Sequence, residues 1–218
     1  MSDFPIDTAI AILRKAVAEW TQPLIEVMDQ AGQSPFQILI ATILSLRTKD
    51  TLTAEVAPRL FAIANTPEAM LQLSPEEIEA AIYPVGFYRN KARTILAICR
   101  RLVDEFDGEV PSDLDTLLTF KGVGRKTANL VVTAGFGLPG ICVDIHVHRI
   151  SNRWGYVETK TPEQTEMALR EKLPSVYWLE YNKLLVTLGQ TLCHPTSPWC
   201  SRCPLREICP QIGVTRRR

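Results

Sequence analysis

Three helix-start signals constrain the fold of this 218-residue sequence more than any other feature. Each is a Ser or Thr followed by Pro, with Gln or Glu at the third position of the expected helix: Ser34-Pro35-Phe36-Gln37, Ser74-Pro75-Glu76-Glu77 and Thr161-Pro162-Glu163-Gln164. The hydroxyl caps the first amides, proline suits the first turn, and the third side chain completes a capping box. Stretches 36–46 and 78–81 then carry apolar residues at three- and four-residue spacing, and no two-residue alternation or Asn-Gly hairpin appears. The sequence therefore predicts an all-α protein.

Composition and charge set the broad class of the protein. With 46% hydrophobic and 22% charged residues, the chain can build one or two compact domains. It has no basic and apolar leader, and no run approaches the roughly 18 apolar residues of a membrane span, so we expect a cytoplasmic protein, nucleoid-associated if bacterial, with no membrane partner. The 24 basic and 24 acidic residues cancel, so bulk charge does not indicate a polyanionic partner.

Segment 193–210 has too few aliphatic residues to build a core and needs another source of order. Four cysteines stand there at C-x6-C-x2-C-x5-C: Cys193, Cys200, Cys203 and Cys209. Disulfides are rare in the cytoplasm, so the pattern indicates four thiolate ligands. Zinc and a [4Fe–4S] cluster both remain open, and the single short knuckle slightly favours the cluster. Cys99 and Cys142 stand in aliphatic surroundings and are expected in the core.

A second motif, Gly122-Val123-Gly124, interrupts the apolar pattern of residues 117–129. Glycine can take a positive φ and lets another backbone approach, so the motif predicts a helix–hairpin–helix turn whose second helix begins near Gly124. The first amides of that helix would be unpaired at the positive end of the helix dipole, which makes a phosphate site. Backbone donors would let a neutral chain bind a polyanion. The alternative is a plain glycine turn between packed helices.

Two further residues near this motif could carry chemistry. Lys126 falls in the first turn of the second helix, where the dipole disfavours a positive charge and partial burial would add to that effect. A neutral amine is the nucleophile that forms a Schiff base with a sugar carbon. Asp144 stands among apolar neighbours, where a carboxylate needs a partner, and it can be a helix N-cap, a functional acid or both. His146 and His148 have no matching metal-ligand partner and are interpreted as hydrogen-bonded structural residues.

The hairpin with Lys126, the segment 143–146 and the cysteine pattern occur in this order and together resemble the endonuclease III family of helix–hairpin–helix glycosylases. Weaker similarity extends over 35–50 and 82–88. The resemblance implies two helical domains that flank a DNA-binding cleft.

The implied domains divide the chain at two places. Residues 24–135 would form a helical barrel that carries the hairpin. Residues 1–23 with 136–218 would form a second domain that holds a [4Fe–4S] cluster on the four cysteines. The expected partner is double-stranded DNA that contains damaged pyrimidines or abasic sites, and the protein is expected to be a monomer.

The resemblance also implies a bifunctional DNA glycosylase and AP lyase of base excision repair. A damaged pyrimidine would be flipped from the stack. Lys126 would attack C1′ and expel the base, and the Schiff base would permit β-elimination of the 3′ phosphate. Asp144 would accept the lysine proton and stabilise positive charge on the sugar.

Further residues match DNA-contacting positions of the family. Arg47 and Phe87 match positions that fill the gap left by the flipped nucleotide; otherwise Arg47 is a solvated helix end and Phe87 a core aromatic. The hairpin residues expected at the phosphate are Lys121, Gly122, Val123, Gly124 and Arg125.

The chain departs from the family pattern at three places. Phe120-Lys121 stands where Leu-Pro is common before the glycines, which adds a charge and is expected to loosen the turn. Arg47 replaces a common glutamine, so contact with the opposite strand is expected to differ. Loop 194–199 lacks the lysines and arginines of relatives, so we expect the hairpin to bind DNA more than this loop does.

Two other functions fit parts of the pattern. A monofunctional mismatch or adenine glycosylase of the same fold is disfavoured by Lys126, because such relatives usually lack this lysine. A non-catalytic DNA-binding module is disfavoured by Asp144 at the matching position.

Overall fold

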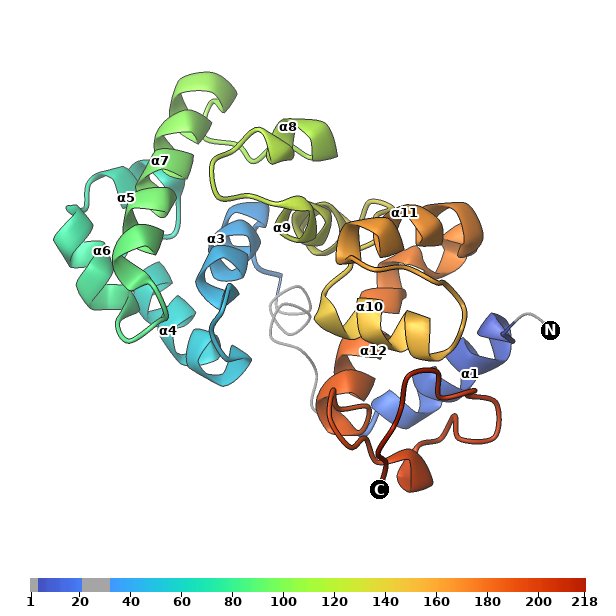
Figure 1. The fold of residues 1–218 in the computed structure, drawn as a ribbon. Helices are drawn as coiled ribbons and strands as arrows, with labels where there is room; N and C mark the ends of the chain where they lie inside the picture. The colour runs from blue at the N-terminus through green and yellow to red at the C-terminus, as the bar shows by residue number, and fades with distance from the viewer. Residues whose placement is uncertain (1–3, 21–31) are drawn as a thin grey trace. The chain divides into compact units, whose positions relative to one another are not determined.

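The computed structural model describes residues 4–20 and 32–218, and these residues form helices without any strand (Figure 1), as expected. The chain divides into two compact units: unit 1 is Met1–Pro23 with Pro139–Arg218, and unit 2 is Leu24–Leu138. The assignment of one part to a helical barrel and the other to a cluster domain stays a prediction. None of the described helices is long and apolar enough to span a bilayer.

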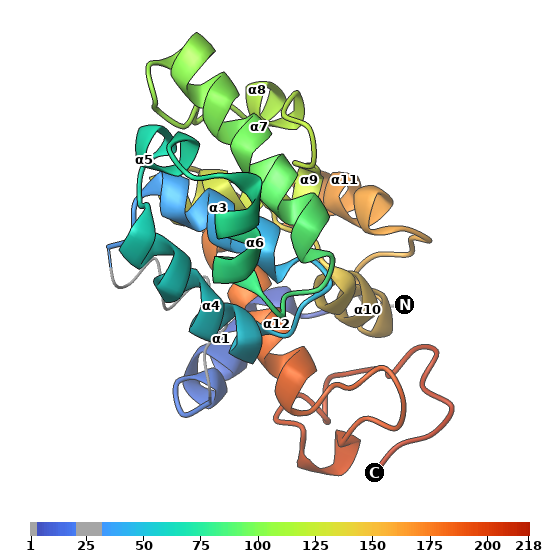
Figure 2. The same ribbon diagram turned by 90° about the vertical axis from the view of Figure 1, so that its left-hand side faces the viewer.

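Unit 2 is built around α3 (Pro35–Ser45), which is buried along most of its length because it is apolar on nearly every side. The other helices of unit 2 are α4 (Asp50–Ile63), α5 (Pro67–Leu71), α6 (Pro75–Ile82), α7 (Tyr88–Phe106), α8 (Leu114–Leu118) and α9 (Arg125–Leu130), which continues as the π-helical turn η1 (Val131–Gly135). Helices α4, α7 and α9 and the turn η1 all pack against α3, and α7 also packs against α5 and α6 (Figure 2).

Unit 1 contains α1 (Ile6–Val17), α10 (Ile145–Arg153), α11 (Pro162–Lys172), α12 (Trp178–Thr191) and the short turns η2 (Ser175–Tyr177) and η3 (Cys200–Arg202). Helix α12 packs against α1 and α10. In the core the Phe4 ring stacks on Trp154 at 4.9 Å, and the fully buried Tyr181 hydroxyl lies 3.0 Å from Ser151 Oγ. After Leu192 the chain has little regular structure, and its buried residues are Pro198 and Leu205.

The three expected helix starts begin α3, α6 and α11. Ser34 and Ser74 form closed capping boxes, in which the side chain of the third helical residue accepts from the serine amide. Thr161 caps α11 through its hydroxyl, but the expected box is not closed there. Gln164 Oε1 instead accepts from the amide of Lys160 at 2.9 Å, because the preceding residue offers a competing donor.

Candidate functional site

The hairpin lies between α8 and α9 and is tightly packed. Gly122 has φ +88°, and a Cβ at this position would lie 2.7 Å from Thr94 Cγ2 on α7. The amide of Val123 donates to the carbonyl of Phe120 at 3.0 Å. Phe120 is 2% exposed and the Arg101 guanidinium lies 4.3 Å from its ring centre. The expected loosening of the turn is therefore wrong, because the aromatic ring anchors the turn in the core.

Gly124 is the N-cap of α9, as expected for a second helix that begins near it. Its φ of −95° and ψ of 176° are ordinary extended values, and a Cβ there would meet nothing within 4 Å. No described side chain caps the helix. The fold thus gives no steric reason for glycine at position 124, and the space beside the first amides of α9 is open to a group from outside the chain.

Lys126 lies in the first turn of α9, as expected, and it is exposed, so partial burial does not act on its amine. The next three residues, Thr127, Ala128 and Asn129, are buried. Asn129 Nδ2 donates to the Arg125 carbonyl at 3.0 Å. Lys126 is therefore an exposed residue on a backbone segment that packing holds in place.

Asp144 caps α10 in unit 1, which confirms the expected N-cap. Its Oδ1 accepts from the amides of His146 at 2.8 Å and Val147 at 2.9 Å, and Oδ2 takes part in neither bond. The side chain is half-buried. Two amide donors therefore hold one oxygen of the carboxylate in place at the start of α10.

The two histidines of α10 are hydrogen-bonded, as expected. Arg149 Nη2 donates to His146 Nδ1 at 3.0 Å, and His148 Nδ1 lies 2.7 Å from Thr165 Oγ1. Arg149 also donates to the Cys193 carbonyl at 2.8 Å. These contacts tie α10 to the start of the cysteine-containing segment.

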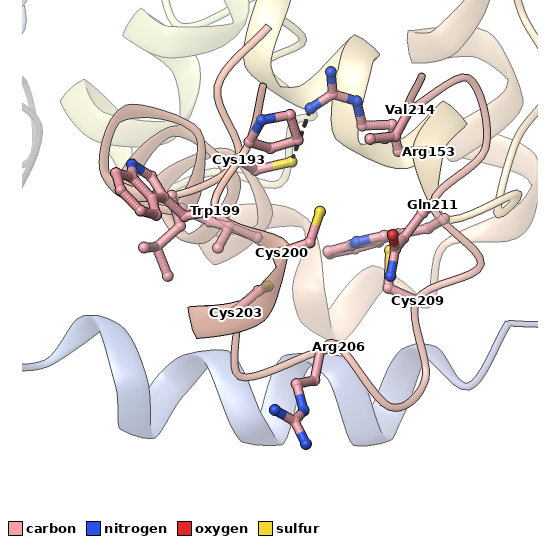
Figure 3. Close-up of a pocket in the computed structure, with 13 residues that line it drawn as sticks. Arg153, Cys193, Trp199, Cys200, Cys203, Arg206, Cys209, Gln211 and Val214 are labelled. Carbon is pink, nitrogen blue, oxygen red and sulfur yellow. Dashed lines mark hydrogen bonds between the residues drawn. The ribbon is translucent and has the colours of Figure 1, made fainter. Parts of the chain in front are cut away.

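The four cysteines of the terminal motif line one cavity in unit 1 (Figure 3). Burial raises the pKa of Cys203 to about 11 and that of Cys209 to about 11, and it also raises the pKa of Cys200. Arg153 Nη1 donates to Cys193 Sγ at 3.2 Å. Thiols in such surroundings need a cationic group to become thiolates.

The side chains around the cavity are not arranged as a single-ion site. In the part of the chain that the structure describes, no three His, Cys, Asp or Glu side chains converge on a point that could hold one metal ion. Cys99 and Cys142 lie elsewhere, 0% and 2% exposed, as expected for core residues.

Arg47 and Phe87 are neighbours in unit 2. The Arg47 guanidinium is 5.5 Å from the centre of the Phe87 ring. Both have a positive φ, 54° and 58°, and Phe87 is 60% exposed, so it is not a core aromatic. An exposed aromatic ring held beside a guanidinium on a strained backbone indicates a binding surface.

Lys91 was missed in the sequence, although its helical spacing could have identified it. It is 7% exposed, and four and seven residues further along α7 are the buried Ile95 and Ile98. A lysine on the apolar face of an amphipathic helix has to find acceptors in the interior. Its amine donates to the Leu44 and Leu46 carbonyls, each at 2.7 Å.

Known proteins match the chain over most of its length. The model of the HhH-GPD superfamily base excision DNA repair protein matches residues 40–175. Endonuclease III of Thermotoga maritima is 45% identical over 175 residues, which cover 80% of this chain and 82% of the relative. Endonuclease III of Escherichia coli is 38% identical over 176 residues, which cover 81% and 83%.

A solved structure matches nearly the full length of the chain. It is a trapped endonuclease III–DNA covalent intermediate, an estranged-adenine complex. Its protein chain is 35% identical, the alignment covers 97% of each chain, and the TM-score is 0.86.

Proposed function

Because this chain belongs to the endonuclease III family of the HhH-GPD superfamily, we propose that Lys126 and Asp144 carry out its chemistry on DNA. The chain is a bifunctional DNA glycosylase and AP lyase of base excision repair. In our proposal its substrates are oxidised pyrimidines and abasic sites in duplex DNA. The observation that carries the proposal is the exposed Lys126 amine, which stands directly after the hairpin in a chain similar to one trapped covalently on DNA.

The proposed reaction begins with the Lys126 amine. Its lone pair attacks C1′ of the sugar, and the bond to the base breaks so that the base leaves with the electron pair and takes up a proton. Opening of the sugar ring gives a Schiff base between the lysine nitrogen and C1′. Loss of a proton from C2′ then expels the 3′ phosphate, and hydrolysis releases the lysine.

Asp144 is proposed to accept the proton that Lys126 loses and to stabilise positive charge on the sugar. Two amides hold Oδ1, so the carboxylate can serve without reorienting, and Oδ2 is the oxygen proposed to accept the proton. The N-cap and the catalytic role thus use different oxygens of one side chain.

The hairpin is proposed to bind a DNA phosphate through the first amides of α9. The open space beside Gly124 supports this role, since a phosphate oxygen can reach the backbone there. The neighbouring residues proposed at the same phosphate are Lys121, Gly122, Val123 and Arg125. Arg47 and Phe87 are proposed to fill the gap left by the flipped nucleotide, and their exposure and contact support this.

The four terminal cysteines are proposed to hold a [4Fe–4S] cluster. The donor set fits, because four thiols line one cavity and the guanidinium of Arg153 lies beside a sulfur. A zinc ion on the same four thiolates is the alternative, and it would need all four sulfurs at about 2.3 Å from one point. When bound, the cluster would order a segment with little core of its own.

Borohydride trapping tests the proposal. Sodium borohydride added during turnover on an oxidised-pyrimidine duplex should reduce the Schiff base and join the DNA covalently to the wild-type protein. Lys126→Gln should lose trapping and strand cleavage while it still binds damaged DNA. Asp144→Asn should slow base release by roughly 10²-fold, the typical worth of a positioned acid–base group.

The matched control is Lys15→Gln, which removes one exposed lysine amine from α1 and should trap as the wild type does. Base release without trapping by the wild type would indicate a monofunctional glycosylase. Efficient trapping by Lys126→Gln would assign the nucleophile to another amine and refute the proposal.

A further inference from the structure

Unit 1 carries a dense set of arginines beside the cysteine cavity. Between residues 193 and 218 the sequence contains one acidic residue, Glu207, and five arginines, which we call the arginine cluster: Arg202, Arg206, Arg216, Arg217 and Arg218. All five are exposed. With histidine neutral and the four cysteines left out of the count, this segment has a net charge of +4, five positive charges less one negative, in a chain whose net charge is zero.

The fold brings the two ends of this segment together. The amide of Arg218 donates to the Pro198 carbonyl at 2.8 Å, and the Arg218 carbonyl accepts from the amide of Ser201 at 2.9 Å. The guanidinium of Arg218 lies 4.6 Å from the centre of the Trp199 ring, and that of Arg202 lies 5.5 Å from it. Arg218 is therefore fixed against the loop that begins the cysteine motif.

Within the segment, Glu207 is the one side-chain carboxylate that can pair with the arginine cluster. Arg206 pairs with Glu207 at 2.6 Å, and Arg217 donates to the neutral Gln211 side chain. Arg206, Arg217 and Arg218 line a shallow groove. Like charges gathered in one place are unfavourable unless another molecule supplies the counter-charge.

We propose that the arginine cluster binds phosphates of the DNA backbone. The inference rests on the proposed function, because the ligand is the same duplex. Guanidinium groups present planar pairs of donors that match phosphate oxygens, independently of base sequence. Loop 194–199 has no lysine or arginine. The guanidinium groups of Arg202 and Arg218, which lie outside the loop in the sequence, are nevertheless close to the ring of its Trp199.

The test compares two double variants with equal loss of charge. Arg216→Gln with Arg217→Gln removes two exposed arginines of the cluster and keeps Arg218 as its anchor. Lys15→Gln with Lys160→Gln removes two exposed lysines of the same unit that lie outside the segment. Affinity for an abasic-analogue duplex is measured as a function of salt for the full chain.

The Arg216→Gln, Arg217→Gln double variant should flatten the slope of log affinity against log salt by up to about 1.8, at about 0.9 per phosphate contact. The lysine double variant should leave the slope unchanged. Borohydride trapping at saturating enzyme should persist in both variants, so failure of this inference differs from failure of the proposed function. An unchanged slope, or equal effects of both variants, overturns the inference. The inference is also overturned if the arginine double variant keeps wild-type binding to DNA and loses binding only to vesicles of anionic lipid.

A separate observation concerns Lys91 in α7. Its amine donates to the Leu44 and Leu46 carbonyls at the end of α3 and to Thr48 Oγ1 at 3.0 Å. Three acceptors match the three N–H bonds of an ammonium group. These acceptors flank Arg47, whose carbonyl lies only 3.1 Å from the position of a Cβ at Gly86.

We propose that Lys91 is a positioning residue for Arg47 and Phe87. This inference also rests on the proposed function, since it concerns the surface that fills the gap in the DNA. The lysine ties the segment that carries Arg47 to α7, and Phe87 is the N-cap of that helix. Without the three bonds, the positive φ of Arg47 has fewer contacts to maintain it.

The test uses 2-aminopurine beside the lesion, because its fluorescence rises when the base unstacks. Lys91→Met keeps side-chain length and removes the donors, so at saturating enzyme it should lose the fluorescence rise, as Phe87→Ala should. Trapping on a pre-formed abasic site should persist. A purely structural role would leave the amplitude at saturation unchanged, because the folded fraction would bind normally.

If Lys91→Met does not fold, Thr48→Val decides the matter, since it removes one acceptor and leaves the lysine in place. It should give a reduced amplitude. A folded Lys91→Met or Thr48→Val protein with the full wild-type amplitude overturns the inference.

Discussion

Substitution of the two hairpin glycines by alanine should separate folding from DNA binding. Gly122→Ala places a Cβ at φ +88°, which costs about 1–2 kcal/mol for an L-residue in that region. The same Cβ lies 2.7 Å from Thr94 Cγ2, and overpacking of this kind costs roughly 1–3 kcal/mol, because a β-branched side chain cannot easily rotate away. We expect the free energy of unfolding to fall by about 2–5 kcal/mol in total.

Gly124→Ala should leave the free energy of unfolding nearly unchanged and should instead weaken DNA binding. Its φ is ordinary and its Cβ meets nothing within 4 Å, so the folded state is not strained. Restriction of the unfolded chain contributes about 0.4–1 kcal/mol of stability, and loss of a glycine N-cap offsets this by a similar amount. The net change in the free energy of unfolding should be near zero. The added methyl would, however, lie where a phosphate approaches the first amides of α9.

The binding loss is estimated from one hydrogen bond to a charged group, about 1.5–3 kcal/mol, which corresponds to roughly a 10- to 100-fold weaker affinity. Urea unfolding and fluorescence anisotropy with an abasic-analogue duplex measure the two quantities on the same samples. Wild-type affinity in a folded Gly124→Ala protein would refute a phosphate contact at these amides. Wild-type stability of Gly122→Ala would refute the packing argument.

Three further predictions follow from the same structure. Cys203→Ser should lower the iron content from about four per chain, as measured by metal analysis, because it removes one cluster ligand. It should also destabilise segment 193–210, as measured by its susceptibility to proteolysis. Stoichiometric zinc in anaerobically purified wild-type protein would contradict the proposed iron–sulfur cluster. Lys121→Ala should flatten the salt dependence of binding by up to about one unit, and an unchanged slope would place Lys121 away from DNA. Burial lowers the pKa of Lys91 from 10.5 to about 8, so between these pH values the unfolded chain binds more protons and stability rises with pH. The stability of wild type relative to Lys91→Met should therefore increase from pH 8 to 10.5 in urea unfolding, and a pH-independent difference would contradict this.

Local signals in the sequence predict the helix starts well, because a cap depends on residues only three positions apart. Ser34 and Ser74 form the expected boxes. At Thr161 the competing Lys160 amide is equally local, but the pattern does not rank the two amide donors, of Lys160 and Thr161, that are within reach of the Gln164 side chain. The π-helical turn Val131–Gly135 was not predicted. It follows α9 where Gly135 approaches Pro35, so its cause lies in packing against α3.

Site residues could be predicted from the sequence where residue type or spacing identifies them. They could not be predicted where their role depends on whether the folded chain exposes or buries the side chain. Asp144 as an N-cap and the common cavity of the four cysteines follow from the residue types. The exposure of Lys126 and the packing of Phe120 depend on which face α9 and the hairpin present to the core. Lys91 could have been recognised by its helical spacing, but its acceptors in residues 44–48 come from a distant part of the chain.

The proposed contacts explain how a chain of zero net charge can bind a polyanion, and they differ in their response to salt. Backbone amides beside Gly124 would add affinity without releasing many counterions, because they carry no full charge. Arginines such as Arg216 and Arg217 would release about one counterion per phosphate that they neutralise. Gly124→Ala should therefore shift the line of log affinity against log salt with little change in slope, whereas the arginine double variant should change the slope itself. If both sets of substitutions changed the slope equally, the hairpin would bind through its side-chain charges, and the division of anchoring between amides and arginines would be wrong.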